Sequence, residues 1–177
     1  MNLAYYEKNY DVELWQAGLL TALFIFPASL LRPVGGWISD RWGGVNTLSL
    51  VLLVVAATLT LIGFSGQSLV LTTLLMMVCF AALGAGNGAL FQLVPLRWPT
   101  TTAVAGSMIG ELGALGGGLV PGGLGLSKQY LGSYAYGFFA LAALALVVLF
   151  VMRVMQIRWT RTWAEKGGRA RLRPTQA

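Results

Sequence analysis

The sequence has no histidine and a single cysteine, Cys79, among its 177 residues. One cysteine cannot form an intrachain disulfide, and the cysteine and histidine spacings of structural metal sites are missing. Cys79 stands inside an apolar run, where we expect a small buried residue. No histidine base is available, and no other pairing of nucleophile and base is evident. We therefore expect no metal, no cofactor and no enzymatic activity.

Charge is also scarce. Charged residues make up 10% of the chain and hydrophobic residues 56%, against about 25% and about 45–50% in a soluble domain. The apolar residues gather in stretches close to or above the roughly 17–25 residues that cross a bilayer as a helix. These stretches lack both the polar stripes of soluble helices and the alternation of barrel strands. The sequence predicts an all-α integral membrane protein with about five transmembrane helices, at residues 14–39, 47–64, 68–96, 102–124 and 134–152.

The net charge of +6 indicates an orientation. We expect an external loop at 1–13, a transmembrane region at 14–153 and a basic cytoplasmic tail at 154–177. A multi-pass plasma (inner) membrane protein with its C-terminus in the cytoplasm satisfies the positive-inside rule. In this topology the chain starts in what resembles a loop between two helices. The basic tail is expected to attract the headgroups of the lipid bilayer rather than nucleic acid. The cations placed inside are Arg41, Arg97, Arg153, Arg158, Arg161, Lys166, Arg169, Arg171 and Arg173.

Glycine is abundant, with 23 residues. Small residues let membrane helices approach closely, because burying apolar surface gains little in lipid. In the fourth stretch, four glycines fall within an arc of about 60° on a helix: Gly106, Gly110, Gly113 and Gly117. We call them the glycine stripe, which suits either another helix or a small ligand. Gly84 and Gly88 are also four apart, and Asn87 beside them suits either a hydrogen bond between helices or a ligand.

Two charged residues lie inside the apolar stretches. Arg32 follows a nearly unbroken apolar run, and an intramembrane arginine normally faces a bundle interior or an aqueous cavity. The alternative is that Arg32 extends towards the membrane edge, since Asp40 and Arg41 are only two turns away. Glu111 is the only acid in a predicted span, about 130° from the glycine stripe. It could carry a proton, pair with an arginine or be buried in its neutral form.

Three motifs resemble a known family. GGWISDRWGG, residues 35–44, resembles the G-x-x-x-D-R-x-G loop motif of the major facilitator superfamily, with Gly36, Asp40, Arg41 and Gly43 at its fixed positions. The basic residue usual after this motif is replaced by Val45 and Asn46. GAGNGALFQLVP and GALGGGLVP resemble the nitrate-signature region in the C-terminal half of the nitrate/nitrite porters, and SLLRPVGG resembles that family's eighth helix.

The resemblance implies a partial major-facilitator fold, covering about helices eight to twelve. It implies nitrate or nitrite transport by alternating access, with Arg32 binding the anion and Gly110, Gly113 and Asn87 beside it. Family members build one site between two halves, so a missing N-terminal half, in the same gene or a separate chain, would be a partner. The alternatives are transport of another small anion and a fragment that does not transport.

Overall fold

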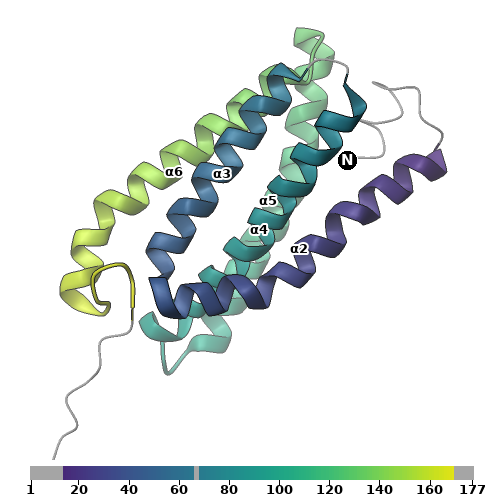
Figure 1. Ribbon diagram of the computed structural model, residues 1–177. Helices are drawn as coiled ribbons and strands as arrows, with labels where there is room; N and C mark the ends of the chain where they lie inside the picture. Colours follow the sequence, from purple (N-terminus) through teal and green to yellow (C-terminus); the bar gives the residue numbers. More distant parts are fainter. Residues whose placement is uncertain (1–13, 66–67, 170–177) are drawn as a thin grey trace, which may run out of the picture.

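The computed structural model describes residues 14–65 and 68–169. They form five helices, shown in Figure 1: α2 (Leu14–Trp42), α3 (Gly44–Phe64), α4 (Leu69–Arg97), α5 (Thr102–Leu131) and α6 (Ala135–Thr162). Each helix is long and apolar enough to cross a membrane. The predicted all-α membrane architecture is therefore confirmed. The external loop expected at 1–13 lies outside the described residues.

The helices are longer than the predicted spans. α5 continues to Leu131 and α6 to Thr162, whereas the apolar stretches end near residues 124 and 152. Hydropathy marks where lipid contact stops, but polar residues also continue a helix readily. α5 ends at Gly132, which adopts a φ of 72°, a left-handed conformation that favours glycine. The first turns of the segment expected to be a tail are therefore the last turns of α6.

The five helices form an open bundle with α4 near its middle. α2 packs along one side of α4, while α3 packs against both α4 and α6. α5 makes smaller interfaces with α6 and α4. Because successive helices run in opposite directions, the end of α2, the start of α3 and the ends of α4 and α6 meet at one end of the bundle (Figure 1).

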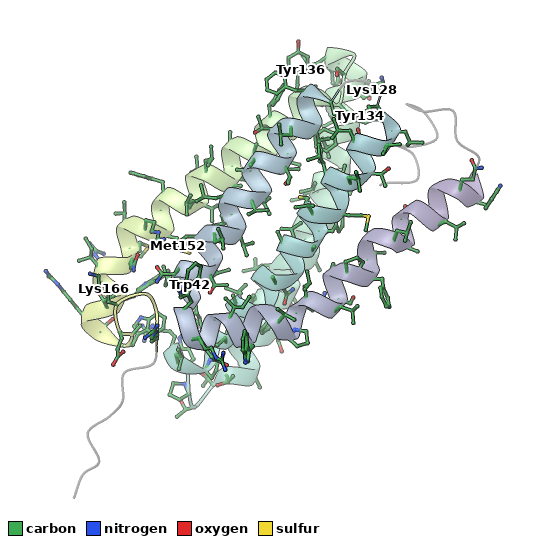
Figure 2. All side chains as sticks on the ribbon, viewed as in Figure 1. Trp42, Lys128, Tyr134, Tyr136, Met152 and Lys166 are labelled. Carbon is green, nitrogen blue, oxygen red and sulfur yellow. The ribbon has the colours of Figure 1, made fainter. Side chains whose placement is uncertain are left out.

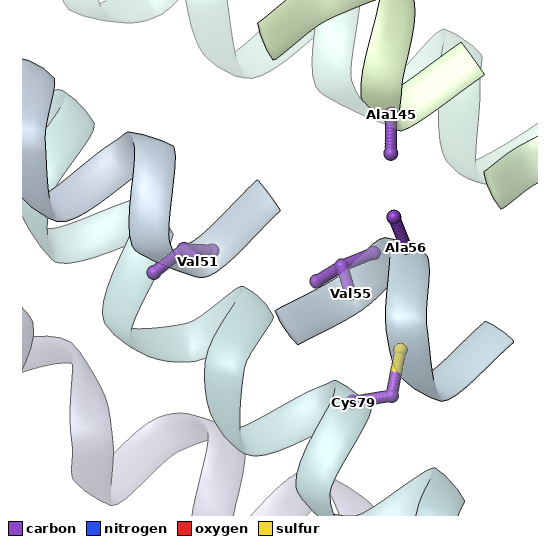
Figure 3. Close-up of a cluster of buried hydrophobic side chains, with 5 residues drawn as sticks. All are labelled: Val51, Val55, Ala56, Cys79 and Ala145. Atoms are coloured by element: carbon purple, nitrogen blue, oxygen red, sulfur yellow. The ribbon is translucent and has the colours of Figure 1, made fainter. Parts of the chain in front are cut away.

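Small side chains form the core between α3, α4 and α6. Figure 3 shows one cluster of five buried residues: Val51, Val55, Ala56, Cys79 and Ala145. Cys79 is free and buried, which confirms the expected packing role. Alanine, valine and cysteine keep these three helices close together, as is typical of helix packing in membranes.

The contact between α2 and α4 is made by backbone atoms. A methyl group added to Gly84 would overlap the carbonyl of Ala28, and one added to Gly88 would overlap the carbonyl of Arg32. From the other side, a methyl group on Gly35 would overlap the backbone of Ala85. These three glycines therefore set the distance between the two helices.

The glycine stripe of α5 is in a different environment. Methyl groups on Gly110, Gly113 and Gly117 would meet no atom within 4 Å, and one on Gly106 would meet only the Phe91 ring, at 3.6 Å. No residue of the apolar window of α5 is buried, although nearly two fifths of the window of α3 is. The stripe therefore remains open on the surface of the described bundle.

The packed glycines of α2 and α4 and the open glycines of α5 predict opposite effects of substitution. Gly84→Ala should lower the free energy of unfolding by about 1–3 kcal/mol, the usual cost of overpacking, because the methyl group has no room beside Ala28. Gly118→Ala on α5 is the matched control, since it meets no neighbour and gains up to about 1 kcal/mol of helix propensity. Denaturation of the two variants in detergent measures the difference. Equal stability would contradict the close α2–α4 contact.

Candidate functional site

Arg32 lies in the second half of α2, and its side chain is exposed. The guanidinium makes no hydrogen bond or ion pair with another residue in the described part of the chain. Its five N–H donors form a rigid planar fork that matches planar oxyanions. Arg32 is therefore an uncompensated cation on the surface of the bundle.

The backbone of Arg32 is held in place by α4. Its carbonyl oxygen lies where a side chain of Gly88 would begin, and the backbone N–H of Gly36, one turn further on, lies 2.9 Å from the same point. Only a glycine at position 88 permits this approach. Pro33 follows directly and lacks an N–H, which removes one bond of the helix ladder at this level. The place of Arg32 along the bundle is thus determined by the glycine-rich segment of α4.

Gly110 and Gly113 lie on the open face of α5, together with an exposed Glu111. The Glu111 carboxylate also has no partner among the described residues. The main interfaces of α2 are with α4 and α3, and those of α5 are with α6 and α4. Arg32 and the α5 glycines therefore stand on helices that flank α4 without a substantial interface of their own.

The Asn87 side chain lies on the side of α4 that faces α3 and α6. This half-buried side chain lines a cavity of about 690 Å³ between α3, α4 and α6. The other side chains of that cavity are apolar, among them Val51, Leu83 and Val147. Gly84 and Gly88 face α2 from the same helix. The Asn87 side chain therefore lies on a different side of α4 from the face that packs against α2.

The loop motif forms the turn between α2 and α3. Gly43 alone connects the two helices, with a φ of 92° that is unfavourable for any side chain. Its N–H donates to the Ser39 carbonyl at 2.8 Å, and its carbonyl accepts from the Thr47 N–H at 3.0 Å. A methyl group added to Gly36, the first glycine of the motif, would only reach ordinary contact with the Gly88 carbonyl, at 3.7 Å.

The charged residues of the motif are exposed on the last turn of α2. The Arg41 guanidinium lies 3.9 Å from the centre of the Trp37 ring, a cation–π distance. Asp40 forms no ion pair within the described ranges. Next to Asp40 in sequence, the fully buried Ser39 donates a hydrogen bond to the Gln92 side chain of α4 at 2.9 Å. This bond joins the motif to α4.

Asn46, which stands in place of the usual basic residue, binds a cation from another helix. Its side-chain carbonyl accepts from Arg153 of α6 at 3.1 Å, and its amide donates to the Trp42 carbonyl at 3.1 Å. The turn therefore has a guanidinium although no basic residue follows the motif. The sequence alone indicated only that Asn46 was unusual at this position.

Residues 163–169, which we call the C-terminal turn, pack against the same place. Ala164 is fully buried, and Gly167 and Gly168 are buried with φ values of 92° and 85°. A methyl group on Gly43 would overlap the Gly167 carbonyl, and one on Gly168 would meet Val45. Part of the predicted tail is thus a folded element, and the sequence signal for it is the Gly167–Gly168 pair. In the described part of the chain, no three histidine, cysteine, aspartate or glutamate residues come close enough to hold a metal ion.

Comparison with known proteins supports one class of protein. No family model and no solved structure matches the chain. It is 35% identical over 173 residues to a protein of Thermus thermophilus named probable nitrate/nitrite antiporter NarK1, which covers 88% of this chain and 37% of that protein. It is 35% identical over 130 residues to the nitrite extrusion protein of Bacillus subtilis, covering 73% of this chain and 33% of that one. A probable nitrate transporter NarT of Staphylococcus aureus is 28% identical over 149 residues, covering 84% and 38%.

Together with the five helices, these matches define a multi-pass membrane protein related to transporters. More particularly, the chain is similar to a part of nitrate/nitrite porters, as its motifs predicted. It spans between 33% and 38% of the length of these three relatives.

The turn at Gly43 can be tested by two matched substitutions. Gly43→Ala and Gly132→Ala both place a side chain at positive φ, a cost of roughly 1 kcal/mol. Only Gly43→Ala also overlaps a neighbour, the Gly167 carbonyl, because Gly132 has nothing within 4 Å. Gly43→Ala should therefore destabilise the protein more and expose residues 163–169 to limited proteolysis. Identical denaturation midpoints and cleavage rates would show that the C-terminal turn does not pack on the motif.

Proposed function

We propose that this chain forms the part of a transporter that binds nitrate or nitrite through Arg32 and moves it by alternating access. The observation that carries the proposal is the unpaired guanidinium of Arg32 on a membrane helix of a chain related to nitrate and nitrite transporters. Transport requires no bond to form or break in the substrate, so the proposed role is not enzymatic. We place the protein in the plasma membrane with its C-terminus in the cytoplasm.

The depth of Arg32 supports this role over contact with lipid headgroups. Trp42 ends α2 and is exposed, and exposed tryptophans favour the membrane interface. At 1.5 Å per residue, Arg32 lies about 15 Å further along the axis. This is about half the thickness of a 30 Å hydrocarbon core. A cation at that depth is costly unless it faces an aqueous cavity or a partner.

The polarity of the helices supports a site that another part of the transporter completes. The windows of α2 and α5 have mean hydropathies of 1.3 and 1.4, against 2.4 for α3 and 2.6 for α6. α2 and α5 also expose Arg32, Glu111 and the glycine stripe. We propose that these faces meet further helices, like those in the rest of the relatives, so that Gly110 and Gly113 admit the anion against backbone.

The first test concerns the shape of the Arg32 head group. In the complete transporter, Arg32→Lys should reduce nitrate and nitrite uptake at least about tenfold, because an ammonium keeps the charge but loses the planar fork. Uptake of labelled nitrate and nitrite by cells measures this. Arg161→Lys, at an exposed arginine beyond the apolar part of α6, is the matched control and should keep normal uptake. Normal apparent affinity in the Arg32→Lys variant would contradict the proposal, as would transport of another anion in preference to both.

The second test concerns Glu111, for which we propose a role in proton coupling. It is the only acid in the described part of α5 and has no partner there. Glu111→Gln should abolish the stimulation of uptake by an inward proton gradient while preserving exchange of nitrate for nitrite, since exchange needs no proton carrier. Flux measurements in proteoliposomes, with and without the gradient, distinguish the two modes. A variant that still responds to the gradient would remove Glu111 from the coupling mechanism.

A further inference from the structure

A shallow groove lies beside the start of α3, at the end of the bundle where α2, α4 and α6 also end. We call this the basic end, because most of the described cations lie there. The groove encloses about 440 Å³ and is lined by Trp42, Asn46, Ser49, Leu50, Leu53 and Arg153. Its polar groups lie at one end, where Asn46 meets Arg153. Its apolar residues Leu50 and Leu53 lie one and two turns beyond Asn46 along α3. The groove therefore changes from polar to apolar along the direction in which a membrane changes from headgroup to hydrocarbon.

The guanidinium of Arg153 is held with one edge free. Its Nη1 donates to the Asn46 side-chain oxygen at 3.1 Å and to the Gln156 side-chain oxygen at 2.9 Å. Two bonds use both hydrogens of Nη1. Nε and Nη2 have no hydrogen-bond partner among residues 14–65 and 68–169. That edge is a fork that fits two oxygens of a phosphate.

Arg153 is placed at headgroup level. It follows the apolar part of α6, 135–152, which at 1.5 Å per residue is about 27 Å long and nearly spans a hydrocarbon core of about 30 Å. Trp42 lines the same groove and is 56% exposed, as is typical of an aromatic residue at the interface. Figure 2 shows Trp42, Met152 and Lys166 gathered at this end of the bundle.

We expect the groove to face the bilayer. It lies beside α3 and α6, the two helices with the highest mean hydropathy, 2.4 and 2.6, whereas the open glycine stripe is on α5. Leu50 and Leu53 are 48% and 50% exposed, so an acyl chain could cover them.

The charge at this end selects the headgroup. Its described acids are Asp40 and Glu165, and its described cations are more numerous: Arg41, Arg97, Arg153, Arg158, Arg161, Lys166 and Arg169. Basic pockets between membrane helices bind anionic headgroups. The excess of positive charge favours a lipid with net negative charge over a zwitterionic one.

From these observations we infer that the groove between α3 and α6 is a binding site for one anionic phospholipid. The phosphate accepts hydrogen bonds from Nε and Nη2 of Arg153, and an acyl chain lies over Leu50 and Leu53. Asn46 and Gln156 are positioning residues, because they hold Nη1 and so orient the free edge. This site does not depend on the transported substrate.

Native mass spectrometry of the full chain in a mild detergent tests the inference. Phosphatidylglycerol should bind about tenfold more tightly than phosphatidylcholine with the same acyl chains. Arg153→Gln should remove this preference through loss of charged hydrogen bonds, and Arg153→Lys should reduce it partly, because charge remains without the fork. Arg158→Gln is the matched control, since it removes the same charge from a position about 140° around α6 and should keep the preference.

Several outcomes would overturn the inference. Equal binding of the two lipids would show that headgroup charge is not recognised. An equal effect of Arg153→Gln and Arg158→Gln would show only a diffuse attraction to the basic end. Displacement of the lipid by inorganic phosphate or glycerol phosphate at the same concentration would assign the groove to a small phosphate, not to a lipid. Helical circular dichroism of each variant shows whether the fold is retained, and the lysine variant decides the matter if Arg153→Gln does not fold.

Discussion

The rest of the structure depends on the direct contact of the α2 and α4 backbones. Gly35, Gly84 and Gly88 each have a neighbouring main chain where a side chain would begin. In a membrane, where apolar burial gains little, such close packing is a main source of helix association. The contact also determines where Arg32 stands, because its carbonyl lies against Gly88. The glycine-rich segment of α4 resembles a ligand site in the sequence. In the structure it positions Arg32 on the neighbouring helix α2.

A second constraint acts at the turn that follows. α2 and α3 are separated by Gly43 alone, so the reversal of the chain needs a positive φ at this residue. The C-terminal turn packs against it, and Arg153 reaches Asn46 from α6. Two parts of the C-terminal region, the C-terminal turn and Arg153, therefore meet the loop motif and the start of α3. The Ser39–Gln92 bond adds α4 to the same assembly, so that α2, α3, α4 and α6 are all joined at this end.

The sequence predicted what hydropathy and local spacing control. The five helices of membrane-spanning length, the burial of Cys79 and the relation to nitrate/nitrite porters were all predicted correctly. Helix ends were predicted less well, since α6 continues through Arg153 and Arg158 after its apolar run has ended. The partners of individual residues could not be predicted, because they join distant segments: Arg153 and Asn46 are 107 positions apart. The same limit applies to glycines, as Gly84 and Gly113 look alike in sequence but one is packed against a backbone and the other is open.

The distribution of polarity across the bundle indicates which surface lipid can cover. Residues facing hydrocarbon must be apolar, and a lone arginine near the midplane costs from about 2.5 to well over 10 kcal/mol, with relief from snorkelling and bilayer thinning. α3 and α6 meet this condition up to the level of Arg153, where the groove turns polar. α2 and α5 do not meet it, since they expose Arg32 and Glu111. The same bundle therefore has one side suited to lipid and two helices suited to an aqueous cavity or further protein. The anion site proposed at Arg32 and the lipid site proposed at Arg153 both rely on this one asymmetry, because each would place a guanidinium where its surroundings can accommodate the charge.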